Sequence, residues 1–149
     1  GFNGVPSVDL CLRWSQLGAF YPFSRNHNMI GDPDQDPAYW EMKGHPEVTA
    51  AARNALRLRY RFLHYLYTLF YKVAKEGGTV VRSLGHEFPK DNQTLDIWEQ
   101  FLWGSNLLIS PYLYEVFENQ HAYFIIFVFL CRIKRKYQCT YPPVNCGMM

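Results

Sequence analysis

Residues 12–28 have the sequence LRWSQLGAFYPFSRNHN. Around its first half, four apolar side chains recur at helical spacing: Leu10, Trp14, Leu17 and Tyr21. Pro22 ends this pattern, because proline lacks the N–H that a helix interior needs. Residues 24–28 then carry a cation, an imidazole and two amides, which suit a ligand rich in hydroxyl groups. The stretch predicts a buried helix followed by a polar loop, which either binds such a ligand or is a solvated turn.

The composition is that of a globular protein. The 149 residues are 48% hydrophobic, 17% aromatic and 19% charged, which excludes a disordered or collagen-like chain and fits one domain length. The net charge of +2 arises in residues 125–149, which hold four cations and no acid, so that residues 1–124 carry −2. We expect no nucleic-acid partner for this slightly acidic body.

Neither end of the chain indicates a membrane span or a leader. The chain starts with Gly1 and shows no signal peptide, as expected for a fragment or an incomplete gene model. The longest apolar run, residues 122–131, is about half a membrane span.

The cysteines lack the spacing of a metal site; they are Cys11, Cys131, Cys139 and Cys146. Cys11 is isolated in the body of the chain. It is either a small buried side chain or half of a disulfide whose partner lies outside the chain.

Ser7 fits a helix N-cap, and Gly18 suggests close packing of the helix that follows. Residues 24–45 show no periodicity, which is typical of a functional or disordered loop. Residues 39–40 (Tyr-Trp) indicate a loop that packs onto the body.

The aspartates at positions 32, 34 and 36 alternate like the start of a calcium-binding loop. An EF-hand loop then needs glycine at its sixth position and glutamate at its twelfth. Here Pro37 and Lys43 occupy these positions, so we expect a solvated turn and no metal.

A long helix is the strongest secondary-structure prediction. Pro46 suits its first turn, apolar residues keep helical spacing from Val48 to Val73, and Gly77-Gly78 is a strong stop signal. We expect a strand at residues 79–84.

Beyond this strand we expect a helix at residues 95–103 and a second strand at 106–114. This alternation of helices and strands favours a parallel α/β layer.

Residues 12–28 closely resemble the signature R-W-x-Q-L-G-A-F-Y-P-F-x-R-N-H-N of glycoside hydrolase family 31, the α-glucosidase family. Shorter resemblances to the family follow at residues 35–37, 58–69, 79–88, 101–111 and 122–124. The resemblance covers roughly residues 1–124. Ser83, Gly85 and His64 depart from the family pattern, which has a proline at the last of these positions.

The resemblance implies an α/β fragment. Residues 1–90 would be the C-terminal portion of a (β/α)8 TIM barrel, with residues 79–84 as its final strand. Residues 91–124 would begin the following β-sandwich, and residues 125–149 form an unmatched tail. In the family, the cysteine that matches Cys11 forms a disulfide with a second cysteine, and no residue of this chain matches that second cysteine. The resemblance therefore implies an unpaired thiol at Cys11.

The resemblance also implies site residues. His27 matches the family histidine that hydrogen-bonds glucose, and Phe2 matches an aromatic residue that lines the same pocket. Arg25 is expected to fix the loop. Retaining glycosidases need two carboxyl groups, but the family's W-x-D-M-N-E motif and its acid/base aspartate match nothing here, so we expect no catalytic residue in this chain. No cofactor is implied.

We therefore expect a fragment of a retaining α-glucosidase that binds an α-glucoside or oligosaccharide and is inactive alone. The alternatives are a dead truncation or splice product, and a noncatalytic sugar-binding or membrane-associated module; we do not favour membrane association of the tail. The family implies the secretory pathway, in lysosomal, extracellular or membrane-tethered form. A barrel that lacks most of its strands should be marginally stable or prone to aggregation.

Overall fold

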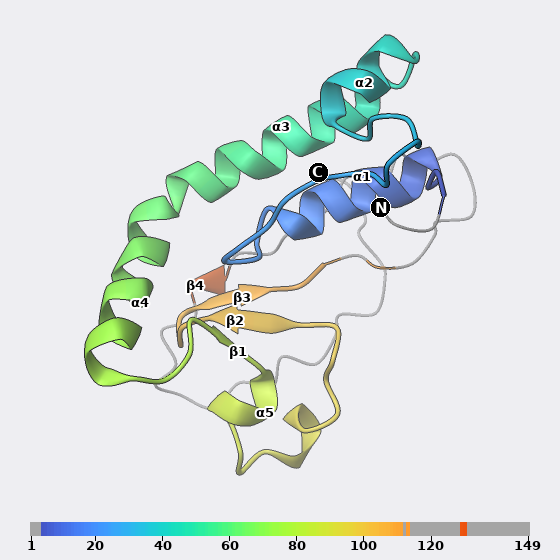
Figure 1. Ribbon diagram of the computed structural model, residues 1–149. Coiled ribbons are helices and arrows are strands. Elements are labelled where there is room, and N and C mark those ends of the chain that lie inside the picture. Colours follow the sequence, from blue (N-terminus) through green and yellow to red (C-terminus); the bar gives the residue numbers. More distant parts are fainter. Residues whose placement is uncertain (1–3, 112, 114–128, 131–149) are drawn as a thin grey trace, which may run out of the picture.

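The computed structural model describes residues 4–111, 113 and 129–130 (Figure 1). Helices make up the first half of this part of the chain, and short strands follow. The elements are α1 (Val8–Gly18), α2 (Pro37–Met42), α3 (Pro46–Arg61), α4 (Leu63–Glu76), β1 (Val81–Arg82), α5 (Leu84–Glu87), the 3-10 helix η1 (Asn92–Thr94), β2 (Phe101–Trp103), β3 (Leu107–Ile109) and β4 (Phe129–Leu130).

Helix α1 begins as the sequence predicts and lies along α3 (Figure 1). Ser7 Oγ accepts a hydrogen bond from Leu10 N at 3.2 Å, which satisfies a backbone donor at the helix start. The close packing expected at Gly18 is wrong, since a Cβ placed there would meet no described atom within 4 Å. The helix meets α3 further towards its N-terminus, where Cys11 and Val48 share a core cluster.

The segment 24–45 is not a loop throughout, because α2 lies within it. Asp36 Oδ1 accepts hydrogen bonds from Ala38 N at 2.9 Å and Tyr39 N at 3.2 Å, and Pro37 occupies the first turn. Trp40 is buried, which confirms that this segment packs onto the body. The carboxylate that resembled a calcium ligand is therefore a helix cap. The described residues contain no group of three or more potential metal ligands.

The long helix predicted from Val48 to Val73 is two helices. Phe62 interrupts it with φ −102° and ψ 8°, and α4 turns away from α3 at this point (Figure 1). The partly buried Phe62 packs against the main core, so the bend lets α4 cover the strands while α3 stays beside α1. The predicted ends are confirmed at Pro46 and at Gly77, which has φ +81°.

The strands form one antiparallel sheet in the order β1-β2-β3-β4. Val81 pairs with Trp103, and Phe101 pairs with Ile109. The expected parallel layer is therefore wrong for these strands, and so is the helix expected at 95–103. A turn through Gly104 joins β2 to β3, and antiparallel strands need only such a short connection.

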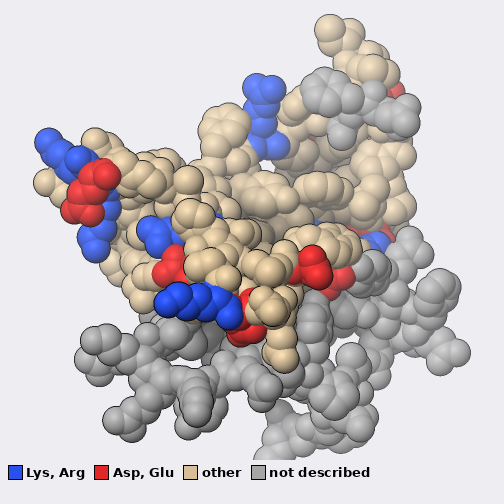
Figure 2. Space-filling model, turned by 90° about the horizontal axis from the view of Figure 1, so that it is seen from below, with Lys and Arg blue, Asp and Glu red and all other residues tan. Residues whose placement is uncertain are grey.

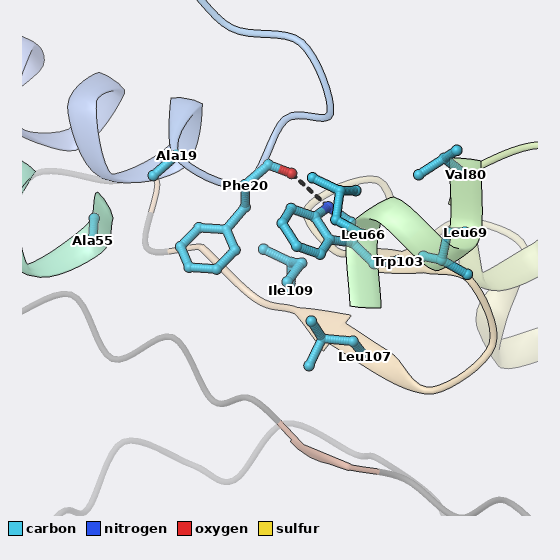
Figure 3. Packing of buried hydrophobic residues seen from close by; sticks show 9 residues of the cluster. All are labelled: Ala19, Phe20, Ala55, Leu66, Leu69, Val80, Trp103, Leu107 and Ile109. Carbon is cyan, nitrogen blue, oxygen red and sulfur yellow. Dashed lines mark hydrogen bonds between the residues drawn. The ribbon is translucent and has the colours of Figure 1, made fainter. Parts of the chain in front are cut away.

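The main core lies between α4, the sheet and the end of α1 (Figure 3). Phe20 and Trp103 are both fully buried there, with ring centroids 5.8 Å apart. A second cluster joins α1, α2 and α3 through Cys11, Trp40 and Val48. Phe20, which belongs to the stretch 12–28, therefore lies in the same core as Trp103 of β2, 83 positions further along the chain.

Lys and Arg side chains are interspersed with Asp and Glu on the face seen in Figure 2, and they form no large patch of one sign. Among the described helices, none is long and apolar enough to cross a membrane.

Candidate functional site

The polar loop begins after the end of α1 and runs back to α2 (Figure 1). His27 lies within it and is half-buried, with its Nδ1 3.4 Å from Asn28 O. A neutral imidazole offers one donor and one acceptor, which fits a pair of sugar hydroxyls.

Two asparagine side chains close the loop onto itself on either side of His27. Asn26 Nδ2 donates to Gln35 O at 2.8 Å, and Asn28 Nδ2 donates to Asp32 O at 2.9 Å. These bonds join residues up to nine positions apart. The loop therefore has a defined course around the imidazole.

Arg59, from α3, fixes the backbone where α1 ends. Its Nη1 donates to Ala19 O at 2.7 Å and to Tyr21 O at 2.6 Å, and its Nη2 donates to Pro22 O at 3.0 Å. Partial burial lowers the pKa of the guanidinium from its ordinary value, but an arginine stays charged in proteins. The three bonds are therefore charge-assisted.

Trp103, from β2, completes this arrangement. Its Nε1 donates to Phe20 O at 2.6 Å (Figure 3), and Arg59 lies over its ring at 5.8 Å from the centroid. Four successive carbonyls, of residues 19–22, thus each accept a bond from one of two side chains.

The structure describes two of the three predicted site residues, His27 and Arg25, and both lie in the loop between α1 and α2. His27 lies in the anchored loop, whereas Phe2 falls outside the described residues. Arg25 is exposed, and no hydrogen bond or ion pair joins it to another described residue, so its expected loop-fixing role finds no contact here.

Cys11 is a buried, free thiol. Burial raises the pKa of this thiol, because the charged thiolate is poorly solvated there. The group is thus suited to packing and not to nucleophilic chemistry.

An open hollow of about 440 Å³ lies beside α1 and β2. Four aromatic side chains border it: Trp14, Tyr21, Trp98 and Phe101. His27 is not among the residues that line it, so it is separate from the polar loop.

Sequence reasoning missed the two residues that hold the backbone, Arg59 and Trp103. Both occur in stretches that carry the family resemblance, 58–69 and 101–111. Nothing local in those stretches showed that they meet residues 19–22, which are 37 to 83 positions away in the chain.

Comparisons with known proteins agree with the resemblance. The glycosyl hydrolases family 31 TIM-barrel domain matches residues 1–69, and the family 31 C-terminal domain matches residues 77–126. The second match includes β1, which the sequence analysis had placed at the end of the barrel. The exact domain boundary, placed at residue 90 above, stays a prediction.

The relatives belong to the same family. Human "probable maltase-glucoamylase 2" is 50% identical over 123 residues, covering 83% of this chain and 5% of its own length. The crystal structure of a family 31 α-glucosidase from Bacteroides thetaiotaomicron has a TM-score of 0.67 at 38% identity, covering 80% of this chain and 19% of its own. A Flavobacterium johnsoniae family 31 dextranase complexed with glucose has a TM-score of 0.63 at 30% identity, covering 72% and 13%.

This chain therefore spans only a small part of the length of its relatives. Its described fold corresponds to part of a TIM barrel followed by part of a C-terminal β domain. With both domain models matched in succession, the chain belongs to glycoside hydrolase family 31.

Proposed function

We propose that this chain is part of a retaining α-glucosidase that hydrolyses terminal α-linked glucose. Its role in that enzyme is to bind the sugar through His27, with Phe2 lining the same pocket. The observation that carries this proposal is the anchored loop, in which a half-buried imidazole stands between two asparagines whose side chains are already engaged.

The engaged amides matter for the choice of ligand contact. Asn26 and Asn28 each donate from Nδ2 to backbone carbonyls, so these two amides shape the loop around the half-buried imidazole of His27, whose Nδ1 lies 3.4 Å from Asn28 O. The names of the relatives, α-glucosidases and a dextranase complexed with glucose, support a glucose-containing ligand.

Hydrolysis needs two carboxyl groups about 5–5.5 Å apart in a retaining enzyme. No carboxylate in the 149 residues matches the family's pair, so we expect the chain alone to bind an α-glucoside without cleaving it.

The activity test uses a longer protein that includes these 149 residues together with the two carboxylates. It should release glucose from maltose and from a nitrophenyl α-glucoside. His27→Ala should lower kcat/KM by about 10- to 100-fold, as expected for loss of a strong hydrogen bond. His64→Ala, an exposed histidine on α4, is the matched control. Absence of glucose release, or equal effects of the two variants, would contradict the proposal.

A further inference from the structure

The carbonyls of residues 19–22 lie at and just beyond the C-cap of α1, where the chain has left the helix and its backbone acceptors need partners from elsewhere. Here they are satisfied by two side chains from distant elements, Arg59 of α3 and Trp103 of β2. We call these two side chains the 59/103 clamp.

The chemistry of the clamp depends on the identity of both side chains. A guanidinium presents donors in a planar, fixed fork, so that one group reaches three carbonyls of a turning backbone. A lysine ammonium is a point charge on a flexible stem and could not hold the same three acceptors in one geometry. The indole of Trp103 packs in the core and donates from its edge to Phe20 O at 2.6 Å.

The clamp ends five residues before His27 in the sequence. Its last acceptor is Pro22 O, and the next anchored side chain is Asn26, so only residues 23–25 separate the two fixed points. Pro22 has a restricted φ, which limits the freedom of the chain further. These two anchors limit the course that the chain can take as it reaches His27.

The clamp also joins the two regions matched by separate domain models. Arg59 and Phe20 lie in the part matched by the TIM-barrel model, whereas Trp103 lies in the part matched by the C-terminal-domain model. A residue of the second region therefore holds the backbone that leads to the polar loop of the first.

We propose that Arg59 and Trp103 are positioning residues for sugar binding: they set the course of residues 19–22 and thereby the place of His27. Through Trp103, the C-terminal region takes part in substrate binding without touching the sugar. This inference rests on the proposed function of His27.

The test uses the whole 149-residue chain and compares Arg59→Lys with Arg57→Lys, an exposed arginine on the same helix. The first measurement is hydrogen exchange of the amides of Phe20 and Tyr21, which donate to Leu17 O and Gly18 O at the end of α1. Arg59→Lys should speed this exchange roughly tenfold or more, as expected from the loss of charge-assisted bonds. Arg57→Lys should leave it unchanged.

The second measurement is the Kd for methyl α-D-glucopyranoside, taken from the NMR shifts of His27 and set beside the thermal midpoint of each variant. Arg59→Lys should weaken binding about tenfold. Trp103→Phe keeps an aromatic ring in the core and removes the donor to Phe20 O, so it should weaken binding by more than its lower thermal midpoint explains. The reference for this comparison is Ile109→Val, a core variant that lowers the midpoint and removes no bond of the clamp. A purely structural role would move affinity only together with the midpoint.

The outcomes separate this inference from the proposed function. If the wild-type chain gives no saturable shift at His27, the sugar-binding function fails, and the exchange rates alone still decide whether the clamp exists. If Arg59→Lys does not fold, Trp103→Phe carries both measurements. A folded Arg59→Lys or Trp103→Phe chain with exchange and affinity equal to Arg57→Lys would overturn the inference.

Discussion

Two buried tryptophans show how differently the two cores of this chain are built. Trp103 is fully buried in the main core, and its Nε1 donates to Phe20 O. Trp40 is 6% exposed in the second core, and its Nε1 donates to no backbone carbonyl of the described residues; the side chain it interacts with is the thiol of Cys11. The first side chain fills space and holds a backbone carbonyl, whereas the second fills space and holds no backbone carbonyl of the described residues. The main core therefore specifies the course of the chain towards the polar loop.

The largest effect should come from emptying the main core. Trp103→Ala removes a fully buried indole, the donor to Phe20 O and the ring that Arg59 lies over, so it should lower the free energy of unfolding by about 3–5 kcal/mol. Urea unfolding followed by circular dichroism measures this loss. If Trp103→Ala lowered the free energy of unfolding by less than Trp40→Ala does in the same assay, the two cores would not differ in this way.

The second-largest effect should come from the turn that follows Trp103 in the chain. Gly104 has φ +56°, and a Cβ there would lie 2.6 Å from Leu69 Cδ2 and 2.8 Å from Tyr65 Oη, which donates to Trp103 O. Gly104→Ala should cost about 2–4 kcal/mol, from backbone strain and overpacking together.

Gly31→Ala is the matched control for this turn. Gly31 has φ +92°, but a Cβ there would meet nothing within 4 Å among the described atoms. It should show the backbone strain alone, about 1–2 kcal/mol. Equal shifts in the urea midpoint for the two variants would show that packing against Leu69 contributes nothing.

A smaller effect should distinguish the two indole N–H groups. Trp103→Phe leaves the buried Phe20 carbonyl without a donor and should cost about 1–3 kcal/mol. Trp40→Phe leaves no backbone carbonyl without its donor, because the Trp40 side chain interacts only weakly with the thiol of Cys11, so it should cost less. The difference in unfolding free energy between the two variants is the quantity to measure, and a reversed order would contradict the comparison.

The smallest effect should appear in alkali. Burial raises the pKa of Cys11, Tyr21 and Tyr65, so the folded chain binds these protons more tightly than the unfolded chain. The contribution of these groups to the free energy of unfolding should be fully present below about pH 8.5. It should fall as the pH rises from their ordinary pKa values towards the raised pKa values of the folded chain.

The urea midpoint measured between pH 8 and pH 10.5 tests this direction. Cys11→Ala should reduce the decrease in the urea midpoint at the lower end of this pH range, because a thiol ionises at lower pH than a phenol. A midpoint that rises with pH would contradict the assignment.

Local signals in the sequence predicted local structure. Ser7, Pro46 and Gly77 each act within one helical turn, and each marks a helix end in the structure. The same logic could have found α2, since Asp36-Pro37 is an N-cap followed by a first-turn proline.

The break at Phe62 was also signalled, though only through the family resemblance. The family pattern carries proline where this chain has His64, and the break places that position in the first turn of α4. A proline is tolerated in a first turn and not in a helix interior. The apolar periodicity continues across Phe62 unchanged, so this pattern could not reveal the break between α3 and α4.

Strand direction and the clamp were beyond local reasoning. A helix was expected at residues 95–103, yet Leu95 and Trp98 are exposed and the segment leads into β2. The bonds from Arg59 and Trp103 to residues 19–22 join positions far apart in the chain, and pairing at such separations depends on the whole fold. The motif containing His27 could be found from sequence, but the residues that hold it in place could not.

The most direct measurement is an NMR titration of the labelled 149-residue chain with methyl α-D-glucopyranoside. It compares His27 with His45, a partly exposed histidine that follows α2 in the sequence. We expect a saturable shift of the His27 ring resonances and no shift at His45. No saturable shift at His27, or an equal shift at both histidines, would contradict it.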